Sequence, residues 1–302
     1  MARSCVRFFM ADDRVLQCDT ESEYLVARDH HHAERLRACG DWVATFPFDF
    51  AGADSTVRLF EAAQFNRRLE SFGSLHTFRC AAFNQPVASF GALATFDCWN
   101  YNQPVVSFGA LREFTSNTFD RPVASFGRLE MFRARRFRQP VTRFGALREF
   151  YSTTFNNPVV SFDRLESFEC ASFNQPVDSF GDLRRFACYS FNQPVASFGR
   201  LETFECADFN QSVRSFDSLE TFDSDRFNQP VASFGNLRTF RALRFNRPIR
   251  SFDNLETFCA YDFDQPIASF GRLATFHSGR FSHRVPPLGS VTTLLAPACR
   301  VE

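Results

Sequence analysis

The chain has 302 residues, and its 34 basic and 34 acidic side chains cancel to a net charge of zero. A neutral chain has no global field that would draw it to nucleic acid or to an anionic membrane, so we expect neither as a partner. Phenylalanine occurs 42 times, against two tryptophans and five tyrosines, which is far beyond ordinary globular usage. A bias of this size must be explained by position in the sequence.

Residues 1–38 form an N-terminal segment of unknown role. Phe8, Phe9 and Met10 are its first apolar run, which is too short for a signal-peptide core, and no later stretch approaches the length of a membrane span. We therefore expect a cytoplasmic protein whose ten cysteines are reduced thiols, with an extracellular surface location as the alternative. The three histidines at 30–32 lack a matching ligand set and are expected in a solvated loop.

A repeat of 18 residues begins at Val57 and runs to residue 290, which gives thirteen turns. Counting Val57 as position 1, leucine recurs at position 1 from Leu75, and phenylalanine occupies positions 4, 9 and 16, with Tyr101 as the one exception at position 9. Position 13 is mostly valine, and position 6 is always small: cysteine, serine or alanine. These columns predict the inward face of a continuous, phenylalanine-rich core.

The spacing of positions 1, 4 and 6, L-x-x-F-x-C, is that of a leucine-rich-repeat strand. We therefore predict a solenoid with a short parallel β-strand in each turn and little helix; a helical-hairpin repeat is the alternative. Proline at position 12 and glycine or aspartate at position 17 (Gly91, Gly109, Asp163, Asp217) predict corners, the second with a left-handed backbone. Asparagine at position 10 predicts a ladder of amides between turns that satisfies backbone groups at the bend.

Both ends of the array are predicted to carry degenerate capping turns, because an exposed end strand invites pairing with another chain. Residues 39–56 are the expected N-terminal cap, with Trp42 and Ala44 at positions 4 and 6 of one earlier turn. Residues 291–302 are the expected C-terminal cap, in which Leu294 and Ala296 keep positions 4 and 6 without phenylalanine.

The segments FNQPVASFG at 83, 191 and 227 and FNQPVDSFG at 173 resemble two repeat families. One is the BspA-like surface-protein repeat, also called DUF285, and the other is the FNIP repeat. Both are regarded as leucine-rich-repeat-like, and neither is known for catalytic residues in its repeats, so the resemblance implies a binding scaffold. Some FNIP proteins carry an F-box, and ERLRACGDWV at 34–43 resembles the end of one, which implies a ubiquitin-ligase adaptor as an alternative.

No catalytic, cofactor or metal site is predicted. The sequence contains no P-loop, dinucleotide fingerprint or nucleophile elbow, and we expect a protein that is not an enzyme. Cysteines stack on adjacent turns at position 6, but serine and alanine replace them elsewhere in this column, which indicates a need for small size and not for sulfur.

The predicted function is binding of a protein partner by a monomer, through the variable positions 5, 7 and 8. Aromatic and arginine side chains at variable positions are typical anchors of protein interfaces. The candidate residues are Trp99, Arg133, Arg135, Arg136, Tyr151, Tyr189 and Tyr261. A surface adhesin of the BspA type is the alternative function. A weaker nucleic-acid alternative depends on the basic cluster Arg133, Arg135, Arg136, Arg138 and Arg143.

Overall fold

The computed structural model describes residues 5–39, 47–69, 71–141, 143–216 and 218–296. The chain divides into two compact units, Met1–Ser152 and Thr153–Glu302. Each unit is a parallel β-solenoid in which every turn contributes one short strand, and the predicted solenoid fold is confirmed. Among the described residues there is one helix, of ten residues, so the helical-hairpin alternative is wrong, and no helix is long and apolar enough to cross a bilayer.

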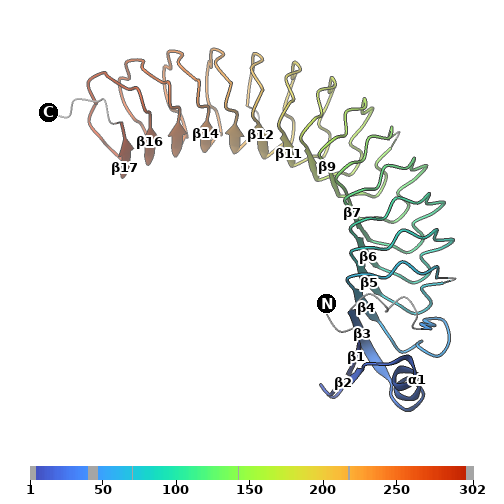
Figure 1. Cartoon of the computed structure of the whole chain (residues 1–302). Helices are drawn as coiled ribbons and strands as arrows, with labels where there is room; N and C mark the ends of the chain where they lie inside the picture. Colours follow the sequence, from blue (N-terminus) through green and yellow to red (C-terminus); the bar gives the residue numbers. More distant parts are fainter. Residues whose placement is uncertain (1–4, 40–46, 70, 142, 217, 297–302) are drawn as a thin grey trace. The chain divides into compact units, whose positions relative to one another are not determined.

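The first unit begins with β1 (Cys5–Met10), β2 (Val15–Cys18), α1 (Glu21–His30) and β3 (Ala33–Cys39), shown at the N-terminal end in Figure 1. β1 pairs antiparallel with both β2 and β3. Thr20 caps α1 in a capping box with Glu23, and the helix buries Tyr24, whose hydroxyl donates to Asp54 Oδ2 at 2.7 Å. His30 is the last residue of α1, and His31 and His32 lie in the short loop before β3; His30 and His32 are exposed, as expected for a solvated segment.

The parallel sheet starts at β3, which pairs with β4 so that Leu36 lies opposite Phe60 and Ala38 opposite Ala62. Leu36 and Ala38 thus occupy positions 4 and 6 of the turn before the array, 24 residues ahead of their partners. Trp42 and Ala44, which the 18-residue period assigned to these positions, lie outside the described residues.

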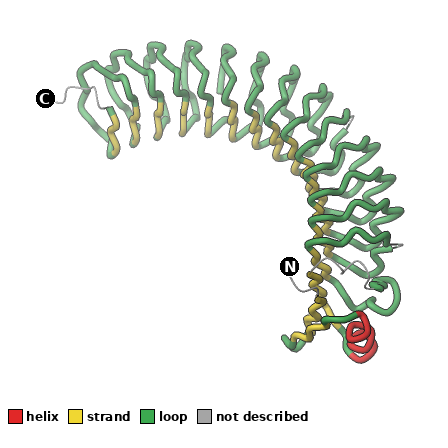
Figure 2. Tube along the Cα trace, viewed as in Figure 1, coloured by secondary structure: helices red, strands yellow, loops and turns green. Residues whose placement is uncertain are grey.

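The strands of the array follow at the predicted period. In the first unit they are β4 (Leu59–Ala62), β5 (Thr77–Cys80), β6 (Thr95–Cys98), β7 (Glu113–Ser116), β8 (Met131–Ala134) and β9 (Glu149–Ser152). In the second unit they are β10 (Ser167–Cys170), β11 (Arg185–Cys188), β12 (Thr203–Cys206), β13 (Thr221–Asp223), β14 (Thr239–Arg241), β15 (Thr257–Cys259), β16 (Thr275–His277) and β17 (Thr293–Leu295). Within each unit the strands stack along one side of the coil and loops complete each turn (Figure 2).

The core consists of three stacked columns of aromatic rings. Rings of one column stack between turns, as in Phe78 over Phe96, with centroids 5.6 Å apart and planes at 11°. Rings of different columns meet edge to face within a turn, as in Phe78 against Phe83 at 5.1 Å and 68°. Both arrangements are favourable for the ring quadrupole. The inward assignment of positions 4, 9 and 16 is therefore confirmed by both packing and burial.

The predicted corners and amide ladder are also present. Gly91 and Asp163 at position 17 have φ of 57° and 51°, in the left-handed region; Asp217 lies outside the described residues. At position 10, the N–H of Asn102 donates to Oδ1 of Asn84 at 2.8 Å, one turn earlier. The same contact joins successive turns in the second unit, so each turn satisfies a backbone donor of the next.

Beyond Phe281 the register continues without phenylalanine. β17 pairs parallel with β16, and Leu294 lies opposite Phe276. Ala296 is buried, whereas Leu288, which precedes β17, and Leu295, within β17, are exposed.

Candidate recognition surface

Residues of each strand alternate between the core and the outer face of the sheet. Positions 4 and 6 point inward, so positions 3 and 5 point outward, and positions 7 and 8 follow where the chain leaves the strand. Backbone bonds fix this exit: the N–H of Asn117 donates to the carbonyl of Trp99 at 3.0 Å, and that of Asp208 to the carbonyl of Tyr189. The backbone at position 7 is therefore held in place whichever side chain it carries.

The structure places most of the predicted anchor residues on the surface. The exposed fraction is 61% for Trp99 and for Tyr189 and 52% for Tyr261, while Tyr151 is half-buried. The ring of Tyr261 lies against Gly279 of the next turn, where a Cβ would meet ring atom Cε2 at 2.2 Å. The glycine is thus needed for the position of this tyrosine.

Arg133, Arg135 and Arg136 are also exposed, and Arg133 lies directly opposite Tyr151 on the adjacent strand. The two therefore form one local patch in the first unit, together with Glu149, whose carboxylate accepts from Arg133 at 3.1 Å. Trp99 lies two turns earlier in the same unit, whereas Tyr189 and Tyr261 belong to the second unit. Each unit thus carries its own exposed aromatic anchors.

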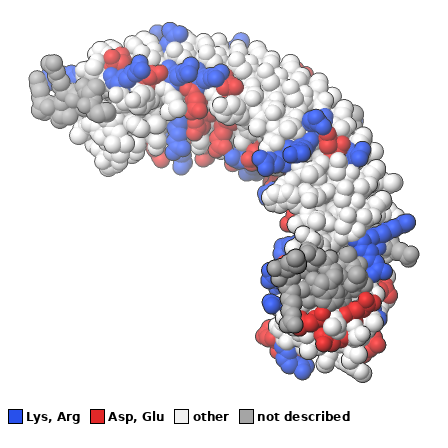
Figure 3. Space-filling view, viewed as in Figure 1, with Lys and Arg blue, Asp and Glu red and all other residues white. Residues whose placement is uncertain are grey.

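The basic cluster that suggested nucleic acid is partly neutralised. Arg138 binds the Asp120 carboxylate through Nε and Nη2, at 3.0 and 2.6 Å, and Arg133 pairs with Glu149. In both units the visible face carries acidic and basic side chains interspersed, without one broad basic field (Figure 3). This arrangement does not favour the phosphate backbone of a nucleic acid.

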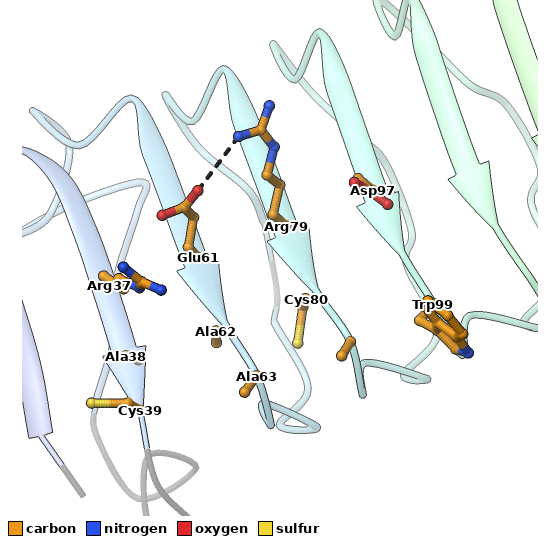
Figure 4. A pocket seen from close by; sticks show the side chains of 11 residues that line it. Arg37, Ala38, Cys39, Glu61, Ala62, Ala63, Arg79, Cys80, Asp97 and Trp99 are labelled. Atoms are coloured by element: carbon orange, nitrogen blue, oxygen red, sulfur yellow. Dashed lines mark hydrogen bonds and ion pairs between the residues drawn. The ribbon is translucent and has the colours of Figure 1, made fainter.

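One open hollow of about 410 Å³ lies on the outer face of the first unit, along the strands β3, β4, β5 and β6. One side of it is a row at position 5 in which the charge alternates from strand to strand: Arg37, Glu61, Arg79 and Asp97. Figure 4 shows these side chains standing on the outer face, with the Glu61–Arg79 ion pair marked.

The charges of this row are unequally satisfied. Glu61 binds Arg35 at 2.5 Å as well as Arg79 at 3.4 Å; although partial burial acts to raise its pKa, these two arginines hold the pKa below its usual range. Among the residues that the structure describes, Asp97 has no ion-pair partner, and loss of solvent around it raises its pKa, opposed in part by the Arg79 charge. Within the described residues, Arg37 and Asp97, at the two ends of the row, are the charges without an ion pair, and Asp97 is the one beside Trp99 that a ligand could neutralise.

The other side of the hollow is the row at position 7, where Cys39, Ala63 and Ala81 are small and Trp99 is large. The three small side chains form the bottom of the hollow, and the exposed indole of Trp99 stands at one end of it (Figure 4). Asp97 and Trp99 are two residues apart on the same strand end, so both border the same end of the hollow. Sequence reasoning identified Trp99 but missed the small residues beside it, although their size in an otherwise variable column was a readable signal.

The cysteines at position 6 are structural. Cys188 is buried, and its thiol donates to the carbonyl of Phe173 at 3.1 Å, as the hydroxyl of Ser224 does to Phe209. Burial raises the pKa of Cys188 to about 11, which keeps it a neutral donor. Within the described part of the chain, no three His, Cys, Asp or Glu side chains meet in a group that could hold a metal ion.

The F-box resemblance finds no structural support. Residues 33–39 form strand β3, whereas the resemblance implied the end of a helical domain. No protein-family model matches the chain, and the comparison with curated proteins finds no match. The BspA-like or FNIP resemblance of the FNQP repeat therefore stays a prediction.

Proposed function

We propose that this protein is a non-catalytic interaction scaffold that binds a protein partner through the outer face of its sheet, with the hollow beside Trp99 as the anchor point. The single observation that carries the proposal is this hollow, in which a large exposed aromatic side chain faces a floor of small side chains. Interface hot spots are concentrated in such pockets, where tryptophan is enriched. The FNQP repeats and their resemblance to binding scaffolds agree with this use.

The charges of the hollow indicate which partner group fits it. The Asp97 carboxylate has no ion pair among the described residues, and its raised pKa shows that its present surroundings disfavour the charge. A cationic side chain above the Trp99 indole would neutralise this carboxylate and gain a cation–π contact, worth about 0.5–2 kcal/mol. We therefore expect the partner to insert an arginine or a lysine between Trp99 and Asp97.

The proposal is tested by selecting peptides from a random display library on the full-length protein. We expect enriched sequences to contain arginine or lysine and to lose binding when the protein carries Trp99→Ala or Asp97→Asn. Val106→Ala is the matched control, because Val106 is an exposed apolar residue at position 14, away from the strands. Selected peptides that bind both hollow variants as tightly as the wild type would show that the hollow is not the anchor.

A further inference from the structure

Two cysteines meet at the N-terminal end of the first unit. Cys5 of β1 and Cys39 of β3 are directly opposite partners in an antiparallel pair, and their Sγ atoms are 2.7 Å apart. Opposite residues in antiparallel strands have Cα atoms about 4.5–5.5 Å apart, within the range of about 4.4–6.8 Å that a disulfide spans. A bond of about 2.05 Å between these sulfurs therefore needs only a small rotation of the side chains and no movement of the strands.

The other stacked cysteines of the chain do not share this geometry. Cys170, Cys188 and Cys206 lie side by side on parallel strands, and each thiol donates to a backbone carbonyl of the preceding turn, at 3.0, 3.1 and 2.9 Å. Within the described residues, the contact between Cys5 and Cys39 is the one sulfur–sulfur contact that we find. The antiparallel pairing of β1 with β3 is what turns two side chains toward each other.

We propose that Cys5 and Cys39 are a modification site, at which a hydroperoxide converts the two thiols into a reversible cross-strand disulfide. The Cys39 sulfur attacks one peroxide oxygen, the O–O bond breaks, and Cys39 becomes a sulfenic acid while the leaving oxygen departs as water. The Cys5 sulfur then attacks the Cys39 sulfur, the S–O bond breaks, and a second water leaves with the Cys5 proton. Two thiols and one hydrogen peroxide thus give one disulfide and two waters.

Exposure assigns the order of these steps. Cys39 is half-buried and lines the open hollow, whereas Cys5 is 4% exposed. Burial, followed by the contact with Cys39, raises the pKa of Cys5 to about 11, so Cys5 stays a thiol at neutral pH. The thiolate is the nucleophile in such oxidations, and the oxidant reaches Cys39 first. Cys5 then resolves the sulfenic acid from a position already in contact with it.

The disulfide would tie β1 to β3, which is the first strand of the parallel sheet. The cysteines are 34 positions apart and enclose β2 and α1, so the bond would restrict the unfolded state of the segment 5–39. Cys39 also borders the hollow, and in Figure 4 its sulfur points away from Ala63 and Trp99. Oxidation would therefore fix Cys39, at the edge of the hollow, in the orientation seen here. The effect on partner binding rests on the proposed function, whereas the formation of the disulfide does not.

The experiment treats the reduced full-length protein with hydrogen peroxide and maps its peptides under non-reducing conditions. We expect the loss of two of the ten thiols, a cross-linked peptide that joins Cys5 to Cys39, and full recovery of both thiols with a dithiol reductant. Cys5→Ser should leave Cys39 as a sulfenic acid that a nucleophilic probe traps, while Cys39→Ser should keep the remaining Cys5 thiol unoxidised. Cys80→Ser is the control and should behave as the wild type, because serine occupies the same column at Ser116.

Retention of all ten thiols in the wild type, or a cross-link between Cys5 and Cys18, would overturn the proposal. If the serine variants fail to fold, the wild type alone still decides the question. Its thermal midpoint should rise after peroxide treatment and return after reduction, because the bond stabilises the folded segment 5–39. A midpoint that does not change while the cross-linked peptide forms would refute the structural consequence.

Discussion

Phe186 and Tyr189 test the assignment of inner and outer columns. They are three residues apart, but replacement by alanine is predicted to cost much stability at Phe186 and little at Tyr189. Phe186 is fully buried, with ring centroids 5.6 Å from Phe168 and from Phe204 and 5.0 Å from Phe191. Burial of a phenylalanine side chain contributes about 1.5–3 kcal/mol, and each favourable ring pair adds about 0.5–1.5 kcal/mol. We therefore expect Phe186→Ala to cost the upper part of the ~3–5 kcal/mol range that such substitutions show.

Tyr189→Ala removes a ring that is 61% exposed and keeps the backbone carbonyl that accepts from Asp208, so its cost should stay within about 0.5 kcal/mol. Each turn contacts only its neighbours, and the damage in Phe186→Ala should appear as local opening around β10, β11 and β12. Hydrogen exchange of amides in these strands, together with urea unfolding, measures both effects. Equal destabilisation by the two substitutions would refute the assignment.

Four further substitutions, at three residues, test individual contacts. Tyr101→Phe should stabilise the protein by about 1 kcal/mol in urea unfolding, because the hydroxyl of Tyr101 is buried without a hydrogen-bond partner among the described residues. Burial acts to raise the pKa of Asp253, but hydrogen bonds, first from Ser233, hold it below the usual range. The contribution of the ionised Asp253 carboxylate to folding stability is therefore present above about pH 4 and lost as the pH falls through the lowered pKa. The difference in thermal midpoint between the wild type and Asp253→Asn should accordingly shrink on acidification. Cys188→Ser keeps the donor to Phe173 and should cost less than about 1 kcal/mol, whereas Cys188→Val should cost about 1–3 kcal/mol by overpacking.

The repeat made most of the fold predictable from sequence, because one wrong assignment would have failed in every turn. Phe78, Phe83 and Phe90 occupy three columns that must all face one interior if any does, and the ring stacking confirms them. Glycine alone at position 17 would only suggest a turn. The alternation of glycine with aspartate, the other residue that tolerates a left-handed backbone, indicated positive φ, which Asp163 and Asp253 show.

The three strands and the helix of residues 5–39 were not predicted, because periodicity carries no information where the loop length changes. Extrapolating 18 residues back from Phe60 assumed that the preceding turn had the same loop, but the segment between β3 and β4 is six residues longer than in the array. The helix could have been found by a different signal. Thr20 and Glu23 have the spacing of a capping box, and the structure shows both of its hydrogen bonds.

The candidate recognition surface was predictable in part. The exposure of a side chain follows from the alternation along a strand, but the depth of a hollow does not. Trp99 and Tyr189 are both exposed at position 7. Only Trp99 borders the hollow described here, because the preceding turns carry Cys39, Ala63 and Ala81 beside it. The shape of the hollow thus depends on which side chains are small at the same position of neighbouring turns. Such residues are adjacent in space but far apart in the sequence.

The pairing of charges between turns bears on the proposed selection of a partner by a chain with no net charge. Several outer charges are paired between turns: Glu61 is shared by Arg35 and Arg79, and Arg185 by Glu169 and Glu205. Such pairs contribute little stability when exposed, but they leave little field for a partner to recognise. A charge at the end of an alternating row lacks one neighbour, as Asp97 does, and so it can select a partner of opposite sign. Substitution at one position 5 would therefore change the sign preference of the adjacent turns as well as its own.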